Sequence, residues 1–194
     1  MSLTSTASTC MYTSPAQIHD FTWRRGQGLL LICSCFLTSD CDTLPVSSGL
    51  LETLPDSSLT ASASYPSNAH TPQRSRFSSG YGWGKHPDDA SPWLQADLGQ
   101  LKSLGKVATK GRDGSHYMYQ WLTSFKLSYS SSDDIFHYVL TGAGDEKVYQ
   151  ANFDSDTIVT QCLSNVHAVK VRLHPLSWNG ACTVLWELYE IQFS

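Results

Sequence analysis

Tyrosine, histidine and aspartate recur in three polar, turn-forming segments of the chain, and these side chains suit the recognition of a sugar or a peptide. The candidate ligand-binding residues are Tyr65, Asn68, His70, Asp88, Asp113, His116, Tyr117 and Tyr119. Tyrosine rings stack on sugar rings and peptides, while their hydroxyls form hydrogen bonds. The carboxylates of Asp88 and Asp113 can accept hydrogen bonds from hydroxyls or a basic side chain. For residues 113–119 an ordinary exposed turn with surface aromatics is an equally open reading.

The same histidines and acids raise the question of catalysis, and the motifs argue against it. A glycosidase needs two carboxylates facing one cleft, and a serine hydrolase needs a serine on a constrained turn beside a histidine. The sequence has no G-x-S-x-G, no H-E-x-x-H and no Gly-rich phosphate loop. The pair Asp133 and Asp134 lies in YSSSDDIFHY, a pattern typical of a solvated hairpin tip. We therefore expect a protein that is not an enzyme.

The composition narrows the class of partner. The 194 residues carry a net charge of -4, and only 15% of them are charged while 41% are hydrophobic. A nucleic-acid binder that relies on a broad basic surface is therefore excluded. A low charge content with many Ser, Thr, Gly and Tyr residues is common in secreted all-β domains.

The first forty residues differ in character from the rest. Arg24 and Arg25 precede an apolar run over residues 29–37, followed by small polar residues, which is the layout of a secretory signal. More than twenty residues precede this run, so a disordered leader or a start near Trp23 remains an alternative. We expect a poorly structured leader over residues 1–40 and a folded domain over residues 41–194.

The elements that must position the candidate residues are β-strands. In SFKLSYS, Phe125 and Leu127 alternate with polar residues, and AVKVRLH repeats the pattern around Val171 and Leu173. The last strand, LWELYEIQF, is apolar on both sides at its start, which predicts that it is covered on both faces. Turn signals such as SWNGA separate the segments. About seven or eight strands at this spacing predict a β-sandwich or β-barrel that the last strand closes.

Six motifs carry a resemblance to a known family. LPDSSLTASASY, WLQADLG, VATKGR, QWLTSFKLSYS, VKVRLHPLSWNG and WELYE occur in this order over residues 41–194. Together they resemble the discoidin domain, also called the coagulation factor V/VIII type C domain. The resemblance implies a distorted jelly-roll β-barrel or sandwich of the galactose-binding-like kind. It also implies a secreted or cell-surface, non-catalytic adhesion module that binds its ligand through loops at one end.

The resemblance also assigns structural residues. Those expected in the core are Trp93, Asp97, Arg112, Trp121, Arg172, Trp178 and Glu187. Asp97 is expected to be a buried hydrogen-bond acceptor. Arg112 and Arg172 are expected to have a structural role, and either could pair with an internal acid such as Asp97 or Glu187.

The cysteines depart from the family pattern. The family commonly joins its first and last residues by a disulfide, but Glu190 and Ile191 stand where the last cysteine belongs. Either Cys162 or Cys182 is then a candidate partner for Cys41, and free thiols are the remaining alternative. Loss of that disulfide would remove a stabilisation of roughly 2 to 4 kcal/mol.

The resemblance brings three loops together at the binding end, namely residues 65–71, 82–89 and 113–119. Tyr65 and Asp88 match the tyrosine and aspartate by which some relatives bind the basic terminus of a peptide. The expected partner is therefore a glycan or a protein on a cell surface, and a purely structural domain is a further alternative.

The residues of these loops leave two other ligands as alternatives, phospholipid and calcium. Lys85, Lys110 and Arg112 supply positive charge, but nearby aspartates offset it, so binding to phospholipid membranes is the alternative and not the main prediction. No cofactor is predicted. Calcium stays possible because Asp88, Asp89 and Asp113 are available, although their spacing is not diagnostic.

Overall fold

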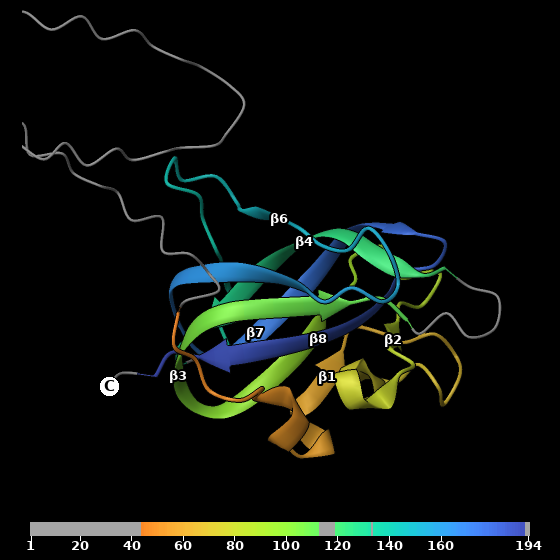
Figure 1. The fold of residues 1–194 in the computed structure, drawn as a ribbon, viewed down its shortest axis with the longest axis horizontal. Helices are drawn as coiled ribbons and strands as arrows, with labels where there is room; N and C mark the ends of the chain where they lie inside the picture. The colour runs from red at the N-terminus through yellow and green to blue at the C-terminus, as the bar shows by residue number, and fades with distance from the viewer. Residues whose placement is uncertain (1–43, 113–118, 133, 193–194) are drawn as a thin grey trace, which may run out of the picture. The chain divides into compact units, whose positions relative to one another are not determined.

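The structure is a computed structural model that describes residues 44–112, 119–132 and 134–192, and these residues form an all-β domain (Figure 1). Its strands are β1 (Leu59–Ala61), β2 (Trp83–Gly84), β3 (Leu94–Lys110), β4 (Trp121–Ser130), β5 (His137–Tyr138), β6 (Val148–Gln150), β7 (Val159–Asn179) and β8 (Thr183–Glu190). The 3-10 helices are η1 (Leu51–Thr53), η2 (Asp56–Ser58), η3 (Pro72–Ser75) and η4 (Phe77–Ser79). The predicted fold class is confirmed. No helix among the described residues is long and apolar enough to cross a membrane.

All strand pairs are antiparallel, in the order β2-β8-β3-β7-β4-β5, with β1 added to β3 and β6 added to β4. The long strands β3 and β7 bend together, because their register jumps from Asp97 opposite Lys170 to Lys102 opposite Ala168. Gly99 lies in this bend at φ +71°, a conformation that favours glycine. Before the bend β3 pairs with β1, and after it with β8. One pair of strands thus contributes to both layers of the sandwich.

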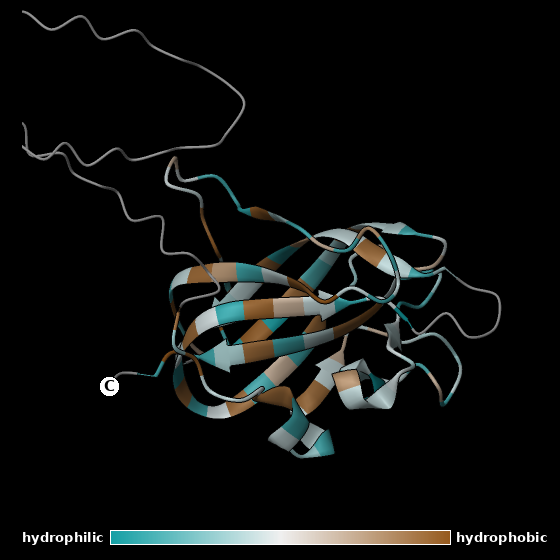
Figure 2. Cartoon of the chain, in the orientation of Figure 1, coloured by the Kyte–Doolittle hydropathy of each residue, from teal (hydrophilic) through white to brown (hydrophobic). Residues whose placement is uncertain are grey.

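Hydrophilic and hydrophobic residues alternate along parts of the strands (Figure 2), and burial follows the predicted pattern. Phe125, Leu127, Val171 and Leu173 are buried, while the residues between them are more exposed. Residues 184–188 are all buried, so β8 is covered on both faces. The length of β3 and β7, 17 and 21 residues, was not predicted. Bulges bend these strands without ending them, and a turn signal and a bulge signal look alike in sequence.

The C-terminal strand closes the fold by pairing back to the start of the domain. Val46 bridges Ile191, and the amides of Ser47 and Leu50 donate to the carbonyls of Glu190 and Leu188. The Glu187 carboxylate, only 2% exposed, accepts the amide of Leu51 at 2.7 Å. Burial raises the pKa of Glu187, although backbone N–H donors oppose part of that rise. Hydrogen bonds to β8 and to the buried carboxylate of Glu187 therefore hold residues 46–51 against the domain.

A substitution at Gly49 tests whether the Glu187 side chain holds the start of the domain in place. A Cβ at position 49 would lie 2.5 Å from Cδ of the buried Glu187 side chain, which backbone hydrogen bonds hold in place. We expect Gly49→Ala to lower the free energy of unfolding by about 1 to 3 kcal/mol, the usual cost of overpacking. Gly142→Ala is the matched control, because nothing lies within 4 Å of its Cβ position. Urea denaturation measures both variants, and equal midpoints for the two would contradict the role given to Glu187.

Several residues expected in the core lie elsewhere. Trp178 is 39% exposed because it lies at the surface near the end of β7. Trp93 and Trp121 are half-buried. The Asp97 side chain is 38% exposed, and it accepts the amide of Gly99 at 2.9 Å across the β3 bend. It is thus a hydrogen-bond acceptor as expected, but not a buried one.

Among the described residues, neither Arg112 nor Arg172 forms an ion pair with Asp97, Glu187 or another acid. Arg172 donates from Nε to Oε1 of Gln95 at 2.8 Å. Its guanidinium lies 4.2 Å from the ring centre of Trp93 and 3.8 Å from that of Phe136. Aromatic stacking and an amide therefore take the place of an acid partner. Arg112 lies beyond the end of β3 and faces a pocket, described below.

The alternative of a disulfide between Cys41 and Cys182 is wrong, because Cys182 is a free, buried thiol. Burial raises the pKa of Cys182 to about 12. Cys41 and the leader lie outside the described residues. The partner of Cys41 and the boundary at residue 40 therefore stay predictions.

Candidate functional site

Antiparallel pairing brings several strand ends to one end of the domain. β3 ends at Lys110 opposite Leu185 near the start of β8, and β4 begins at Trp121 opposite Asn179 at the end of β7. The segments that precede and follow these ends must therefore meet. β2 joins them because Gly84 pairs with Thr183.

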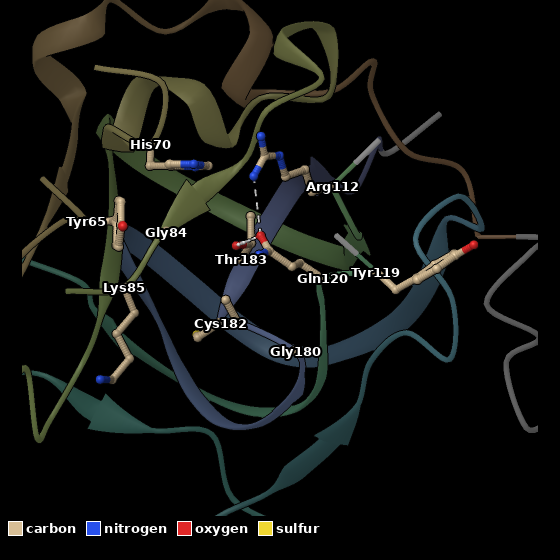
Figure 3. A pocket seen from close by; sticks show the side chains of 11 residues that line it. Tyr65, His70, Gly84, Lys85, Arg112, Tyr119, Gln120, Gly180, Cys182 and Thr183 are labelled. Carbon is tan, nitrogen blue, oxygen red and sulfur yellow. Dashed lines mark hydrogen bonds between the residues drawn. The ribbon is translucent and has the colours of Figure 1, made fainter. Parts of the chain in front are cut away.

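A pocket of about 640 Å³ opens at this end, and we call it the terminal pocket (Figure 3). Its lining residues are Tyr65, His70, Gly84, Lys85, Arg112, Tyr119, Gln120, Gly180, Ala181, Cys182 and Thr183. They come from four separate segments of the chain. Its volume lies in the range of roughly 300 to 1,000 Å³ that is usual for small-ligand sites.

Hydrogen bonds fix the inner wall of the terminal pocket. Gln120 is 6% exposed, and its Oε1 accepts the Thr183 hydroxyl at 3.0 Å and Nη1 of Arg112 at 3.5 Å (Figure 3). The Arg112 amide donates to the Gln120 carbonyl at 3.0 Å. Gly180 adopts φ +65°, and a Cβ there would lie 2.8 Å from the Tyr119 carbonyl oxygen. The wall is therefore held in one arrangement before any ligand binds.

The rim of the terminal pocket is aromatic. Tyr65 is 48% exposed and Tyr119 is 73% exposed, so both rings are open to a ligand. Tyr65 meets the His70 ring edge-on at 5.7 Å between ring centres. His70 Nδ1 lies 3.3 Å from the Gly82 carbonyl oxygen. Burial lowers the pKa of His70, the hydrogen bond to the Gly82 carbonyl opposes part of that fall, and the charge of Arg112 adds to it, so the neutral form of the ring is favoured.

Lys85 lines both the terminal pocket and a second hollow of about 430 Å³. Its ammonium donates to the carbonyls of His86 at 2.9 Å and Pro87 at 3.0 Å, and lies 5.8 Å from the Trp178 ring centre. Pro175, Leu176 and Trp178 line this second hollow together with Asp88 and Asp89.

The structure brings together only part of the predicted ligand set. Tyr65, His70 and Tyr119 line the terminal pocket. Asp88 lines the second hollow and Asn68 a third, so Tyr65 and Asp88 do not line one site. Asp113, His116 and Tyr117 lie outside the described residues.

Sequence reasoning missed most of the inner wall. Gln120 opens the motif QWLTSFKLSYS but was not singled out as a site residue, and Thr183 lies in none of the quoted motifs. Arg112 was expected in the core. Antiparallel pairing of the predicted strands could have indicated this wall. The turn after Trp178 must lie at the same end of the domain as the start of β4, where Gln120 lies. No group of three or more His, Cys, Asp or Glu side chains among the described residues is arranged to hold a metal ion.

Comparison with known proteins agrees with this architecture. Residues 58–188, more than half of the chain, match the family model of the F5/8 type C domain. Lactadherin of Rattus norvegicus is 31% identical over 146 residues, which cover 70% of this chain and 34% of lactadherin. This chain thus spans about a third of that relative.

Solved structures share the fold. Discoidin II of Dictyostelium discoideum superposes with a TM-score of 0.57 at 25% identity, covering 70% of this chain and 56% of that one. CpGH89CBM32-5 of Clostridium perfringens, solved with GalNAc-β-1,3-galactose, gives a TM-score of 0.53 at 17% identity, covering 75% and 100%. Family model, sequence relatives and fold therefore agree, and the chain belongs to the F5/8 type C, or discoidin, domain family.

Proposed function

We propose that this chain is a non-catalytic extracellular binding module that recognises a cell-surface glycan in the terminal pocket. The observation that carries the proposal is the pocket itself. Two exposed tyrosines form its rim, and a buried, hydrogen-bonded wall of Gln120 and Thr183 lies beneath them. Stacking groups around preorganised polar groups are what a sugar ring requires. The sugar-bound C. perfringens module indicates that this fold accommodates a glycan.

Membrane binding is the second candidate, and a specific observation favours it. Leu176 and Trp178 are 44% and 39% exposed beside Lys85, an apolar pair next to a cation. Such groups can enter a lipid interface. Against it, Asp88 and Asp89 line the same hollow, and they would be brought toward an anionic surface. The glycan therefore stays the main proposal.

The test is a screen of the full chain on a glycan array and on vesicles of phosphatidylserine and phosphatidylcholine, with and without calcium. We expect glycan signals that do not need calcium. Binding to anionic vesicles alone would replace the glycan with the membrane. Silence on both surfaces would point to a protein ligand or a structural role.

Removal of the aromatic rim should weaken glycan binding. The double variant Tyr65→Ala/Tyr119→Ala loses both stacking surfaces, and we expect its affinity to fall about tenfold or more, since each aromatic contact is worth roughly 1 kcal/mol. Tyr138→Ala is the control, because Tyr138 is 36% exposed but lies on β5, which pairs with Ser128 and Tyr129 near the end of β4, whereas the pocket lies at the start of β4. Titration of the strongest array glycan measures all three proteins. An equal loss of glycan affinity in Tyr138→Ala would show that the tyrosines of the rim do not bind the glycan.

A further inference from the structure

The ionisable side chains that line the terminal pocket carry an excess of positive charge. Arg112 and Lys85 line it, and no carboxylate of a described residue does so. Lys85 also lines the second hollow, where its ammonium donates to two backbone carbonyls, so Arg112 is the main source of this excess. His70 cannot offset this positive charge, because an imidazole is either neutral or positive. The acids nearest in sequence to Lys85, namely Asp88 and Asp89, line the second hollow. A partly enclosed site with excess positive charge favours a ligand group of negative charge.

Arg112 differs from the arginines that stabilise the fold. Arg76 donates to the Asp56 carboxylate at 2.7 Å and to the carbonyls of Leu51 and Leu54 at 2.8 Å each. Arg172 is bonded to Gln95 and stacked between two rings. Arg112 has only the long 3.5 Å contact from its guanidinium to Oε1 of Gln120 among the described residues.

None of the ion pairs between described residues includes Arg112. Its guanidinium is half-buried on the pocket wall between His70 and Gln120 (Figure 3). A guanidinium offers several N–H donors in a planar fork that matches a carboxylate in two parallel hydrogen bonds. Arg112 therefore has donors left over for a ligand, and they suit an oxyanion better than a neutral hydroxyl.

We infer that the terminal pocket selects an acidic sugar, one whose carboxylate binds the Arg112 guanidinium while Tyr65 and Tyr119 contact its ring. The inference rests on the proposed glycan-binding function and narrows its ligand class. A sugar fits better than a lipid headgroup, because both exposed rings of the rim are tyrosines, which can stack on a sugar ring and hydrogen-bond to its hydroxyls. Lys85, on the rim, adds attraction over a longer range.

Three matched pairs of oligosaccharides test the inference on the full chain. They are galactobiose with digalacturonic acid, cellobiose with cellobiouronic acid, and lactose with 3′-sialyllactose. We expect the acidic member of at least one pair to bind about tenfold more tightly than the neutral one, with a preference that shrinks as salt rises. Arg112→Gln should remove the preference, and Arg112→Lys should retain part of it. Far-UV circular dichroism and thermal unfolding show whether each variant is folded.

Arg74→Gln is the matched control, because Arg74 lies outside the terminal pocket with its guanidinium 5.6 Å from the Tyr81 ring centre. It removes the same charge and should leave the preference intact. Equal or tighter binding of every neutral member would overturn the inference and leave the glycan-binding proposal standing. Preference for acids that survives Arg112→Gln would also overturn it. Binding to phosphatidylserine vesicles with no sugar bound would overturn both.

Discussion

Replacing Trp186 by alanine is expected to lower the free energy of unfolding by about 3 to 5 kcal/mol, the usual cost of deleting a large core aromatic. Trp186 is fully buried at the centre of β8, opposite Thr109 of β3. Its indole Nε1 donates to the buried hydroxyl of Ser75 at 3.2 Å, so the variant also leaves that hydroxyl without this donor. The expected loss is a large part of the stability of an ordinary domain.

Trp178→Ala supplies the matched control for this prediction, because the same residue type is 39% exposed there. We expect a smaller loss, of about 1 to 2 kcal/mol, since more than a third of this side chain is already exposed to solvent. Chemical denaturation followed by far-UV circular dichroism measures both variants. Similar losses at the two positions would contradict the burial that the structure assigns to Trp186.

Filling the terminal pocket should abolish glycan binding without unfolding the domain. Ala181 lines the pocket and is exposed in the turn between β7 and β8. In Ala181→Trp the indole would occupy space that a ligand needs, and we expect affinity to fall about a hundredfold or below detection. Titration calorimetry with the strongest array glycan measures the loss.

Ala143→Trp is the control for pocket filling, since Ala143 is exposed in a turn and does not line the pocket. Both variants should unfold within a few degrees of the parent chain, because surface substitutions rarely change stability by more than about 0.5 kcal/mol. Glycan binding that persists in a folded Ala181→Trp variant would place the ligand elsewhere.

The sequence predicted the fold well because burial follows a period of two along each strand. Phe125, Leu127, Val171 and Leu173 are readable in this way. It predicted Trp178 badly, because the tryptophan of SWNGA is apolar in type yet lies where β7 leaves the core. Residue type gives the tendency of a side chain to be buried, whereas the geometry of the strand end decides its exposure.

The site was only partly predictable, for a related reason. Tyr65, His70 and Tyr119 follow from residue types that suit a ligand. Gln120 and Thr183 become a wall only because two turns distant in sequence meet and share a hydrogen bond. Arg112 was expected in a structural role, but the register of β3 places it on the pocket wall. Long-range register, which one sequence does not reveal, therefore determines which polar residues face the ligand.

The most direct test of the central proposal is an amide NMR titration of the 194-residue chain with the strongest array glycan. If the ligand binds in the terminal pocket, the Gly84, Gln120 and Thr183 amides should show saturable shifts. The amides of β6, beside the middle of β4, and of β5, near the end of β4, should stay unchanged. Saturable shifts confined to residues outside the terminal pocket would contradict the proposal.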